Sequence, residues 1–163
     1  MNESLLNREP VRRVQAALDA AGAGAGIIAL EGTARTAQDA ADALGCKLGA
    51  IVKSLVFRSG DEAVMALVAG DRQCDLKVLR DELGLPDKPK RADADFVREK
   101  TGFSIGGVPP LGHPARISIL IDQSISRFDP VFAAAGHPHC VYSTSFKELV
   151  RATSGKISEK VGC

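Results

Sequence analysis

TGFSIGGVPPLGH, residues 101–113, is the stretch that decides how this chain is interpreted. It holds four glycines and two adjacent prolines, so it predicts neither a helix nor a strand. Glycine opens backbone conformations that other residues avoid, whereas proline fixes φ and removes a hydrogen-bond donor. We therefore expect a shaped loop whose backbone N–H and C=O groups can approach a ligand, because long shaped loops in compact domains usually carry function.

A second segment, IVKSLVF at residues 51–57, predicts a central strand with one charged residue. Alternation places Lys53 on a face with Ile51, Leu55 and Phe57, and both faces are largely apolar. An ammonium group is costly to bury there unless it has a partner. The pattern alone favours two interpretations equally: a functional lysine, or one whose stem packs while its head reaches water.

The rest of the chain predicts intermingled helices and strands. Helices are expected at residues 10–21, 36–44, 75–83, 93–101 and 145–153, and strands at 27–30, 51–57, 62–69, 117–121 and 140–143, with a partly helical segment at 126–135. Residues 59–61 predict a hairpin between the second and third strands. The mixture indicates an α+β fold with a mixed sheet. We expect residues 1–163 to form one domain that ends in a mobile polar tail, residues 154–163.

Composition limits the partners. The chain carries a net charge of +1 and only 4% aromatic residues, which argues against a wide nucleic-acid footprint with many stacked bases. A basic cluster at Lys88, Lys90 and Arg91 is expected to be a solvated surface.

The sequence also favours a cytoplasmic protein. It shows no secretory signal and no apolar run long enough to span a membrane. The cysteines are widely spaced and are expected to be free, small apolar residues: Cys46, Cys74, Cys140 and Cys163.

The Gly-Gly-Val-Pro-Pro-x-Gly-His segment at residues 106–113, together with the strand that carries Lys53, resembles the YbaK/prolyl-tRNA-synthetase editing-domain family. The likeness runs roughly from Val11 to Val150. Free-standing members are deacylases that remove wrongly attached amino acids from tRNA. The resemblance implies a curved, barrel-like mixed sheet surrounded by helices.

The same resemblance implies the substrate and the partners. We expect the chain to bind the acceptor end of a mischarged tRNA, with tRNA(Pro) carrying alanine, 2-aminobutyrate, cysteine or serine as the best guess. No cofactor, membrane or DNA partner is expected. A transient association with prolyl-tRNA synthetase or an elongation factor is compatible with this role.

Site residues follow from the matching positions. Lys53 occupies the position of the family's essential lysine, which would neutralise a carbonyl oxygen or hold a ribose or phosphate oxygen. Gly106 and Gly107 would bring backbone amides to the scissile ester. The remaining expected substrate-binding residues are Ser104, Val108, Pro109, Pro110, Gly112, His113, His137 and His139. Where some members carry an acidic residue, this chain has Ala-Gly-His-Pro-His-Cys-Val at residues 135–141, which leaves the specificity open.

Other interpretations of the same residues stay open. Three histidines could form a catalytic zinc site, and the loop could bind a nucleotide or an RNA 3′ end without hydrolysis. Residues 102–106 fit the G-x-S-x-G nucleophile elbow, but that motif needs a strand before it and a helix after it, which the sequence does not predict. Asp122 could act as a general base, although a helix cap is the favoured role.

Overall fold

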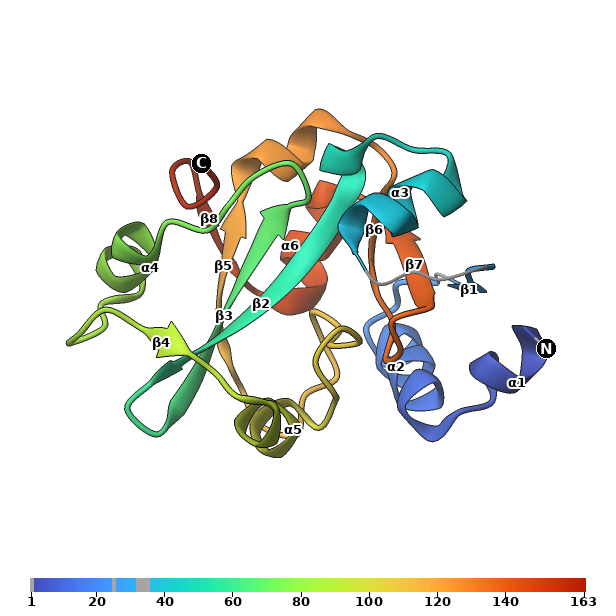
Figure 1. The fold of residues 1–163 in the computed structure, drawn as a ribbon, viewed down its shortest axis with the longest axis horizontal. Coiled ribbons are helices and arrows are strands. Elements are labelled where there is room, and N and C mark those ends of the chain that lie inside the picture. The colour runs from blue at the N-terminus through green and yellow to red at the C-terminus, as the bar shows by residue number, and fades with distance from the viewer. Residues whose placement is uncertain (1, 25, 32–35) are drawn as a thin grey trace.

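The structure is a computed structural model that describes residues 2–24, 26–31 and 36–163 (Figure 1). The strands are β1 (Ile27–Ala29), β2 (Ile51–Ser59), β3 (Glu62–Ala69), β4 (Lys90–Arg91), β5 (Ser118–Asp122), β6 (Val131–Ala134), β7 (Cys140–Thr144) and β8 (Lys156–Ser158). The helices are α1 (Asn2–Leu6), α2 (Glu9–Ala20), α3 (Ala37–Leu44), α4 (Leu76–Leu83), α5 (Ala94–Thr101) and α6 (Phe146–Thr153), with short 3-10 segments η1 (Leu48–Ala50) and η2 (Gln123–Arg127).

The described strands form one mixed, curved sheet. Its order is β1-β7-β6-β2-β3-β5-β8, and β4 pairs with β2 off this path. The expected β2–β3 hairpin is confirmed and closes at Ser59 and Glu62. Three joins are parallel, β2 with β6, β3 with β5 and β5 with β8. The expected α+β class with a mixed sheet is therefore confirmed.

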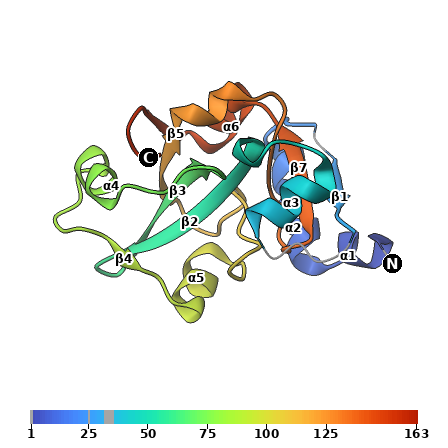
Figure 2. The same ribbon diagram turned by 45° about the horizontal axis from the view of Figure 1, so that its top comes forward.

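Neighbouring residues of β2 face different parts of the core. Val52 belongs to the main apolar cluster, which α2 and α6 complete with Leu18 and Leu149. Ile51 points to the other face, where it packs with Ala40 of α3. Figure 2 shows α3 lying over the sheet near β7. Strand β2 thus has helices on both sides, as its apolar sequence predicts.

Helix ends follow local chemistry. The Thr36 hydroxyl accepts a hydrogen bond from the backbone N–H of Asp39, and Gly45 ends α3 in the left-handed conformation. The carboxylate of Asp93 caps α5, which ends at Gly102 with φ 80°. The chain therefore passes from Gly102 directly into the loop that follows α5.

Several segments of the structure differ from the sequence-based prediction. Residues 126–135, which were expected to be partly helical, hold only the end of the short η2 and then β6, which pairs with both β7 and β2. The alanines there favour a helix intrinsically, but pairing between two strands overrides that preference. Helix α1 was not expected from the sequence.

The prediction of a mobile tail is wrong. Strand β8 pairs with β5, and Val161 is fully buried. The hydroxyl of Ser158 donates to the carboxylate of Glu82 at 2.6 Å. Polar composition hid these contacts because the buried residues are few and lie far in sequence from their partners. Among the helices that the structure describes, none has the length and apolarity needed to cross a membrane.

Candidate active site

A cavity of about 580 Å³ lies beside β2 and is bounded by α3, β6 and the loop after α5. It brings Lys53 together with Gly106, as the sequence predicts. Its walls are mostly apolar, with contributions from Ala40, Phe132 and Val141. Within the described residues, Lys53 is the one ionisable side chain in its lining. A single cation in an apolar cavity acts with little competition from other charges.

The cavity faces a gap in strand pairing. One edge of β2 is paired with β3 along its length. The opposite edge pairs with β6 at Ile51 and Val52 and with β4 at Phe57 and Arg58. Residues 53–56 have no strand partner on that edge in the described structure.

The direction of the free backbone groups follows from the ladder. The carbonyl of Ile51 accepts a hydrogen bond from Gly70 on the β3 side, at 2.7 Å. Backbone groups alternate between the two edges of a strand, so those of Ser54 and Val56 point toward the gap. The gap therefore offers peptide donors and acceptors to a ligand in the cavity.

The side chain of Ser54 adds an unsatisfied hydroxyl to the unpaired backbone groups at this gap. Its hydroxyl is buried and has no hydrogen-bond partner among the described residues. Leaving a buried hydroxyl unpaired costs about 1–3 kcal/mol, so such groups usually await a ligand or a water. Ser54 lines the cavity. Sequence analysis missed it, although a serine within an otherwise apolar strand face was a usable signal.

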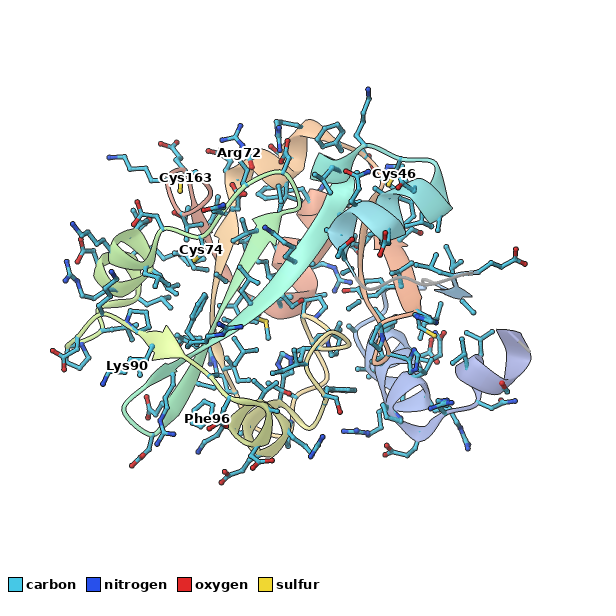
Figure 3. The ribbon with its side chains drawn as sticks, viewed as in Figure 1. Cys46, Arg72, Cys74, Lys90, Phe96 and Cys163 are labelled. Atoms are coloured by element: carbon cyan, nitrogen blue, oxygen red, sulfur yellow. The ribbon has the colours of Figure 1, made fainter. Side chains whose placement is uncertain are left out.

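Lys53 is half-buried and is the third of the nine residues of β2. Its ammonium group donates to the carbonyl oxygen of Arg72. Figure 3 labels Arg72, which lies in the loop after β3. This bond supplies the partner that a cation among apolar residues requires. An ammonium has three donors, so two are left for a ligand.

The loop that carries Arg72 is itself held on both sides. Asp71 accepts two hydrogen bonds from Arg127 of η2, at 2.6 and 3.0 Å, and they keep the pKa of this carboxyl below its usual range. The backbones of Gln73 and Cys163 exchange two hydrogen bonds of 2.9 Å. The carbonyl that fixes Lys53 therefore belongs to a well-anchored turn.

The two loop glycines have different roles. Gly106 is exposed, has φ 92° and lines the cavity, and no hydrogen bond within the described structure uses its N–H. Gly107 instead donates its N–H to the Ser104 carbonyl at 3.0 Å, and its own carbonyl accepts from Gly136 at 2.8 Å. The amide of Gly107 is therefore occupied within the protein, and only the Gly106 amide is available to a substrate.

Packing explains why position 107 holds a glycine. A Cβ there would lie 2.8 Å from the backbone of Gly136 and of His137, so it would clash with the neighbouring turn. Close approach of two backbone segments is a common cause of a required glycine.

Most of the remaining loop residues support the cavity without lining it. Val108 is buried and reaches the cavity, whereas Pro109, Pro110 and Gly112 do not. His113 is tied to the Pro109 carbonyl through Nε2 at 2.8 Å, and burial lowers the pKa of its imidazole.

The second histidine segment contacts the cavity through its proline. Pro138 lines the cavity, but His137 and His139 do not. Their rings lie 5.3 Å apart, and Nδ1 of His137 accepts from the backbone of His139 at 3.1 Å. Burial is the main cause that lowers the pKa of His137.

The structure does not assemble the three-histidine site. In the described part of the chain, no group of three or more metal-ligating side chains comes together. Ser104 is exposed and lies outside the cavity lining, and no helix follows it. These positions leave neither a histidine cluster nor a serine nucleophile at the cavity.

Asp122 caps the N-terminus of η2, which is the role that the sequence favours. Its buried carboxylate accepts from the N–H and the hydroxyl of Ser124, each at 2.8 Å, and from the N–H of Ala69 at 3.0 Å. The cysteines are free, and burial raises the pKa of the Cys74 thiol to about 11. Cys140 is buried as expected, whereas Cys163 is exposed.

Comparison with known proteins places this geometry in a family. The sequence model of the aminoacyl-tRNA editing domain matches residues 31–152. The chain belongs to the aminoacyl-tRNA editing domain family. The matched span contains Lys53, the loop after α5 and the histidine segment, so the whole candidate site lies within the editing domain.

Relatives differ in how much of them the chain covers. It is 33% identical over 132 residues to the uncharacterized protein YwhH of Bacillus subtilis (strain 168), which covers 80% of this chain and 83% of that protein. It is also 33% identical over 92 residues to the proline–tRNA ligase of Thermoanaerobacter sp. (strain X514), which covers 56% of this chain and 16% of the ligase. The chain thus corresponds to a small part of the ligases that it matches.

A solved structure agrees with the fold of this editing domain. It was described as a proposed trans-editing enzyme for prolyl tRNA synthetase, and it superposes with a TM-score of 0.87 at 38% identity, over 93% of this chain and 96% of that one. The expected editing-domain fold is confirmed by this likeness.

Proposed function

We propose that the chain is a trans-editing deacylase that hydrolyses the ester of a mischarged tRNA, with tRNA(Pro) bearing a small non-cognate amino acid as the substrate. The observation that carries this proposal is the cavity in which Lys53, the Ser54 edge of β2 and the Gly106 amide meet. Membership of the editing-domain family and the likeness to a proposed trans-editing enzyme support it.

The chemistry uses water as the nucleophile. Attack on the ester carbonyl builds negative charge on its oxygen, which the Lys53 ammonium and the Gly106 N–H stabilise. No side chain in the described lining can act as a general base, because Lys53 is its one ionisable group. The free ribose hydroxyl of the substrate supplies proton transfer in this proposal.

Ser54 and the open edge of β2 hold the aminoacyl group. The buried hydroxyl accepts a hydrogen bond from the α-ammonium, and the backbone carbonyl of Ser54 provides a second acceptor. The walls around Ala40, Phe132 and Val141 are apolar. They favour alanine, 2-aminobutyrate or cysteine over serine, whose hydroxyl is more costly to transfer from water to an apolar wall.

The test is a panel of aminoacyl-tRNAs. Alanyl-, cysteinyl-, seryl- and prolyl-tRNA(Pro) are compared at equal concentration, with alanyl-tRNA(Ala) as the control for tRNA identity. We expect the alanyl and cysteinyl esters of tRNA(Pro) to be hydrolysed fastest and the prolyl ester to be spared by at least about 10-fold. Binding without turnover of any ester would replace the proposal with a non-catalytic binding module.

A further inference from the structure

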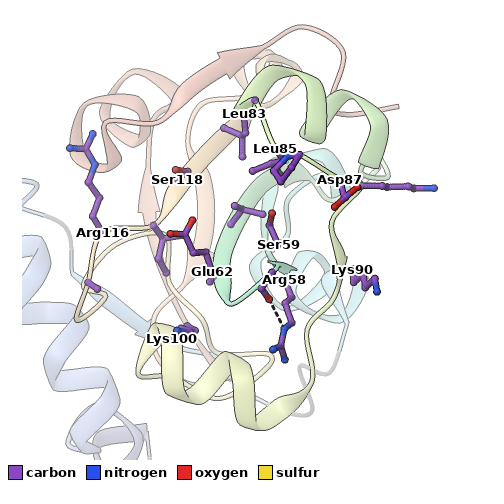
Figure 4. A pocket seen from close by; sticks show the side chains of 18 residues that line it. Arg58, Ser59, Glu62, Leu83, Leu85, Asp87, Lys90, Lys100, Arg116 and Ser118 are labelled. Carbon is purple, nitrogen blue, oxygen red and sulfur yellow. Dashed lines mark hydrogen bonds between the residues drawn. The ribbon is translucent and has the colours of Figure 1, made fainter.

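A second cavity of about 900 Å³ lies at the closed end of the β2–β3 hairpin (Figure 4). It shares no lining residue with the candidate active site. The hairpin residues Arg58, Ser59 and Glu62 lie in the middle of the view, with Arg116 on one side and Lys90 on the other. We call this cavity the hairpin groove.

Positive charge is concentrated in the hairpin groove. Five cationic side chains line it against two carboxylates, although the whole chain carries a net charge of only +1. They come from separate segments of the chain: Arg58, Lys88, Lys90, Lys100 and Arg116. A concave surface of one charge sign focuses its field and attracts ligands of the opposite sign.

Two of these cations are already engaged. Arg58 donates to the Gly60 carbonyl at 2.7 Å and pairs with Asp61 at 3.2 Å, while its guanidinium lies 4.8 Å from the Phe96 ring centre. The ammonium of Lys100 lies over the same ring, 5.8 Å from its centre. These residues shape the groove, and the aromatic ring they cover is not open for stacking with a base.

Three cations are available to a ligand. Within the part of the chain that the structure describes, no hydrogen bond or ion pair engages the side chains of Lys88, Lys90 or Arg116. Lys88, Lys90 and Arg116 are all exposed. Exposed, unpaired cations around an open groove suit an extended polyanion better than a small ligand that must be enclosed.

The groove is linked to the candidate active site along β2. A small cavity of about 220 Å³ shares Ser54 and Gly106 with the active-site cavity and reaches Arg91, the neighbour of Lys90 in β4. Lys53 and Arg58 are five residues apart on one strand, which corresponds to roughly 17 Å. A few nucleotides of single-stranded RNA can bridge that separation.

We propose that the hairpin groove binds the phosphodiester backbone of the acceptor arm of an RNA substrate whose 3′ end occupies the active-site cavity. This inference rests on the proposed function. Backbone contacts fit the groove because its free groups are cations and its nearby aromatic ring is covered. They position the RNA without reading its sequence.

The test compares two variants with equal loss of charge. Lys88→Gln/Lys90→Gln/Arg116→Gln removes the free cations of the groove, and Lys47→Gln/Lys147→Gln/Lys160→Gln removes three exposed lysines elsewhere. Binding of uncharged tRNA(Pro) and of its acceptor-stem minihelix is measured from low to high KCl. We expect the groove variant to lower the log–log salt slope by about 2–3 and to bind at least about 10-fold more weakly at low salt, while the control stays near the wild type.

Hydrolysis separates this inference from the proposed function. The groove variant should raise KM for an aminoacyl minihelix at unchanged kcat, and it should hydrolyse an aminoacyl ester of adenosine like the wild type. Equal RNA affinity and equal salt slope in the groove and control variants would overturn the inference. Failure of the wild type to hydrolyse either ester would overturn the proposed function, while the binding measurements would still decide the role of the groove.

Discussion

At the scale of single residues, Lys53 is the most exacting test of the proposed chemistry. Its ammonium is the one charge in the described lining of the cavity. Lys53→Ala should lower kcat for deacylation by about 10²–10³, the usual effect of losing one preorganised electrostatic contact. The measurement is single-turnover hydrolysis, with Lys77→Ala on the exposed side of α4 as the control. Deacylation near the wild-type rate would contradict the role assigned to Lys53.

Ser54 allows a prediction in which stability and activity change in opposite directions. Its buried hydroxyl has no partner among the described residues, so Ser54→Ala removes an unsatisfied group. The variant should keep or raise its Tm, because such a hydroxyl destabilises the fold by about 1–3 kcal/mol. Its kcat/KM should fall, since the aminoacyl group loses an acceptor. A lower Tm with unchanged kcat/KM would instead make Ser54 a packing residue.

Sequence predicts a site residue well when its chemical type contrasts with its neighbours. It predicts poorly which loop side chains face the cavity. Lys53 stood out as a cation within an apolar strand, and the structure places it in the cavity. His113, His137 and His139 were expected to bind substrate because of their places in the family-like segments, yet none of them lines the cavity. Loop sequence does not reveal which side chains turn inward, and Ser54 became visible only through its lack of a partner.

At the scale of elements, the loop after α5 depends on its contact with the turn at residues 136–137. A Cβ at Gly107 would meet that turn at 2.8 Å, so Gly107→Ala should lower Tm as well as activity. Gly106→Ala should lower Tm less, because φ 92° is strained for alanine by about 1–2 kcal/mol but only the Pro138 ring, at 3.3 Å, lies near. Its activity should fall more than its folded fraction, because the available amide moves. Thermal melts and hydrolysis on one preparation decide both outcomes, and equal Tm values for the two variants would contradict this division of roles.

The turn that carries Arg72 gives a prediction for pH. The Arg127 hydrogen bonds lower the pKa of Asp71 in the folded state, so the unfolded chain binds more protons in the window between the folded and unfolded pKa values. The Asp71–Arg127 pair therefore contributes to the free energy of unfolding above the ordinary Asp pKa of about 4. This contribution is lost as the pH falls through the pKa of Asp71 in the folded state. Asp71→Asn should show a smaller drop in Tm between about pH 5 and pH 3 than the wild type. Parallel pH curves for the two proteins would show that the ion pair contributes nothing.

Helices and strands were predicted correctly where the signals are local, namely hydrophobic periodicity and the capping or turn residues at their ends. The β2–β3 hairpin and the capped ends of α3 and α5 lie where the sequence places them. Strand β6 was missed because its alanines carry no strand signal, and its existence depends on β2 and β7. Pairing between distant segments is a tertiary effect, which a local pattern cannot contain.

At the scale of the whole molecule, the last residues of the chain connect the sheet to the candidate site. Val161 is fully buried, and β8 extends the sheet beside β5. The backbone hydrogen bonds between Cys163 and Gln73 reach the same turn that offers the Arg72 carbonyl to Lys53. Composition alone suggested a mobile tail at this end, whereas the structure makes it part of the support for the turn that holds Lys53.

Removal of residues 159–163 tests that connection. Exposing the cavity left by Val161 costs roughly 1.5–3 kcal/mol, which corresponds to a Tm lower by about 3–12 °C. The shortened protein should also lose kcat at temperatures where it is fully folded, because the Gln73 anchor is gone and the Arg72 carbonyl no longer fixes the ammonium group. Lys160→Ala, which changes an exposed side chain in the same segment, is the matched control. A shortened protein with a lower Tm but normal kcat below its melting range would confine the segment to stability, and one with an unchanged Tm would show that its burial contributes little.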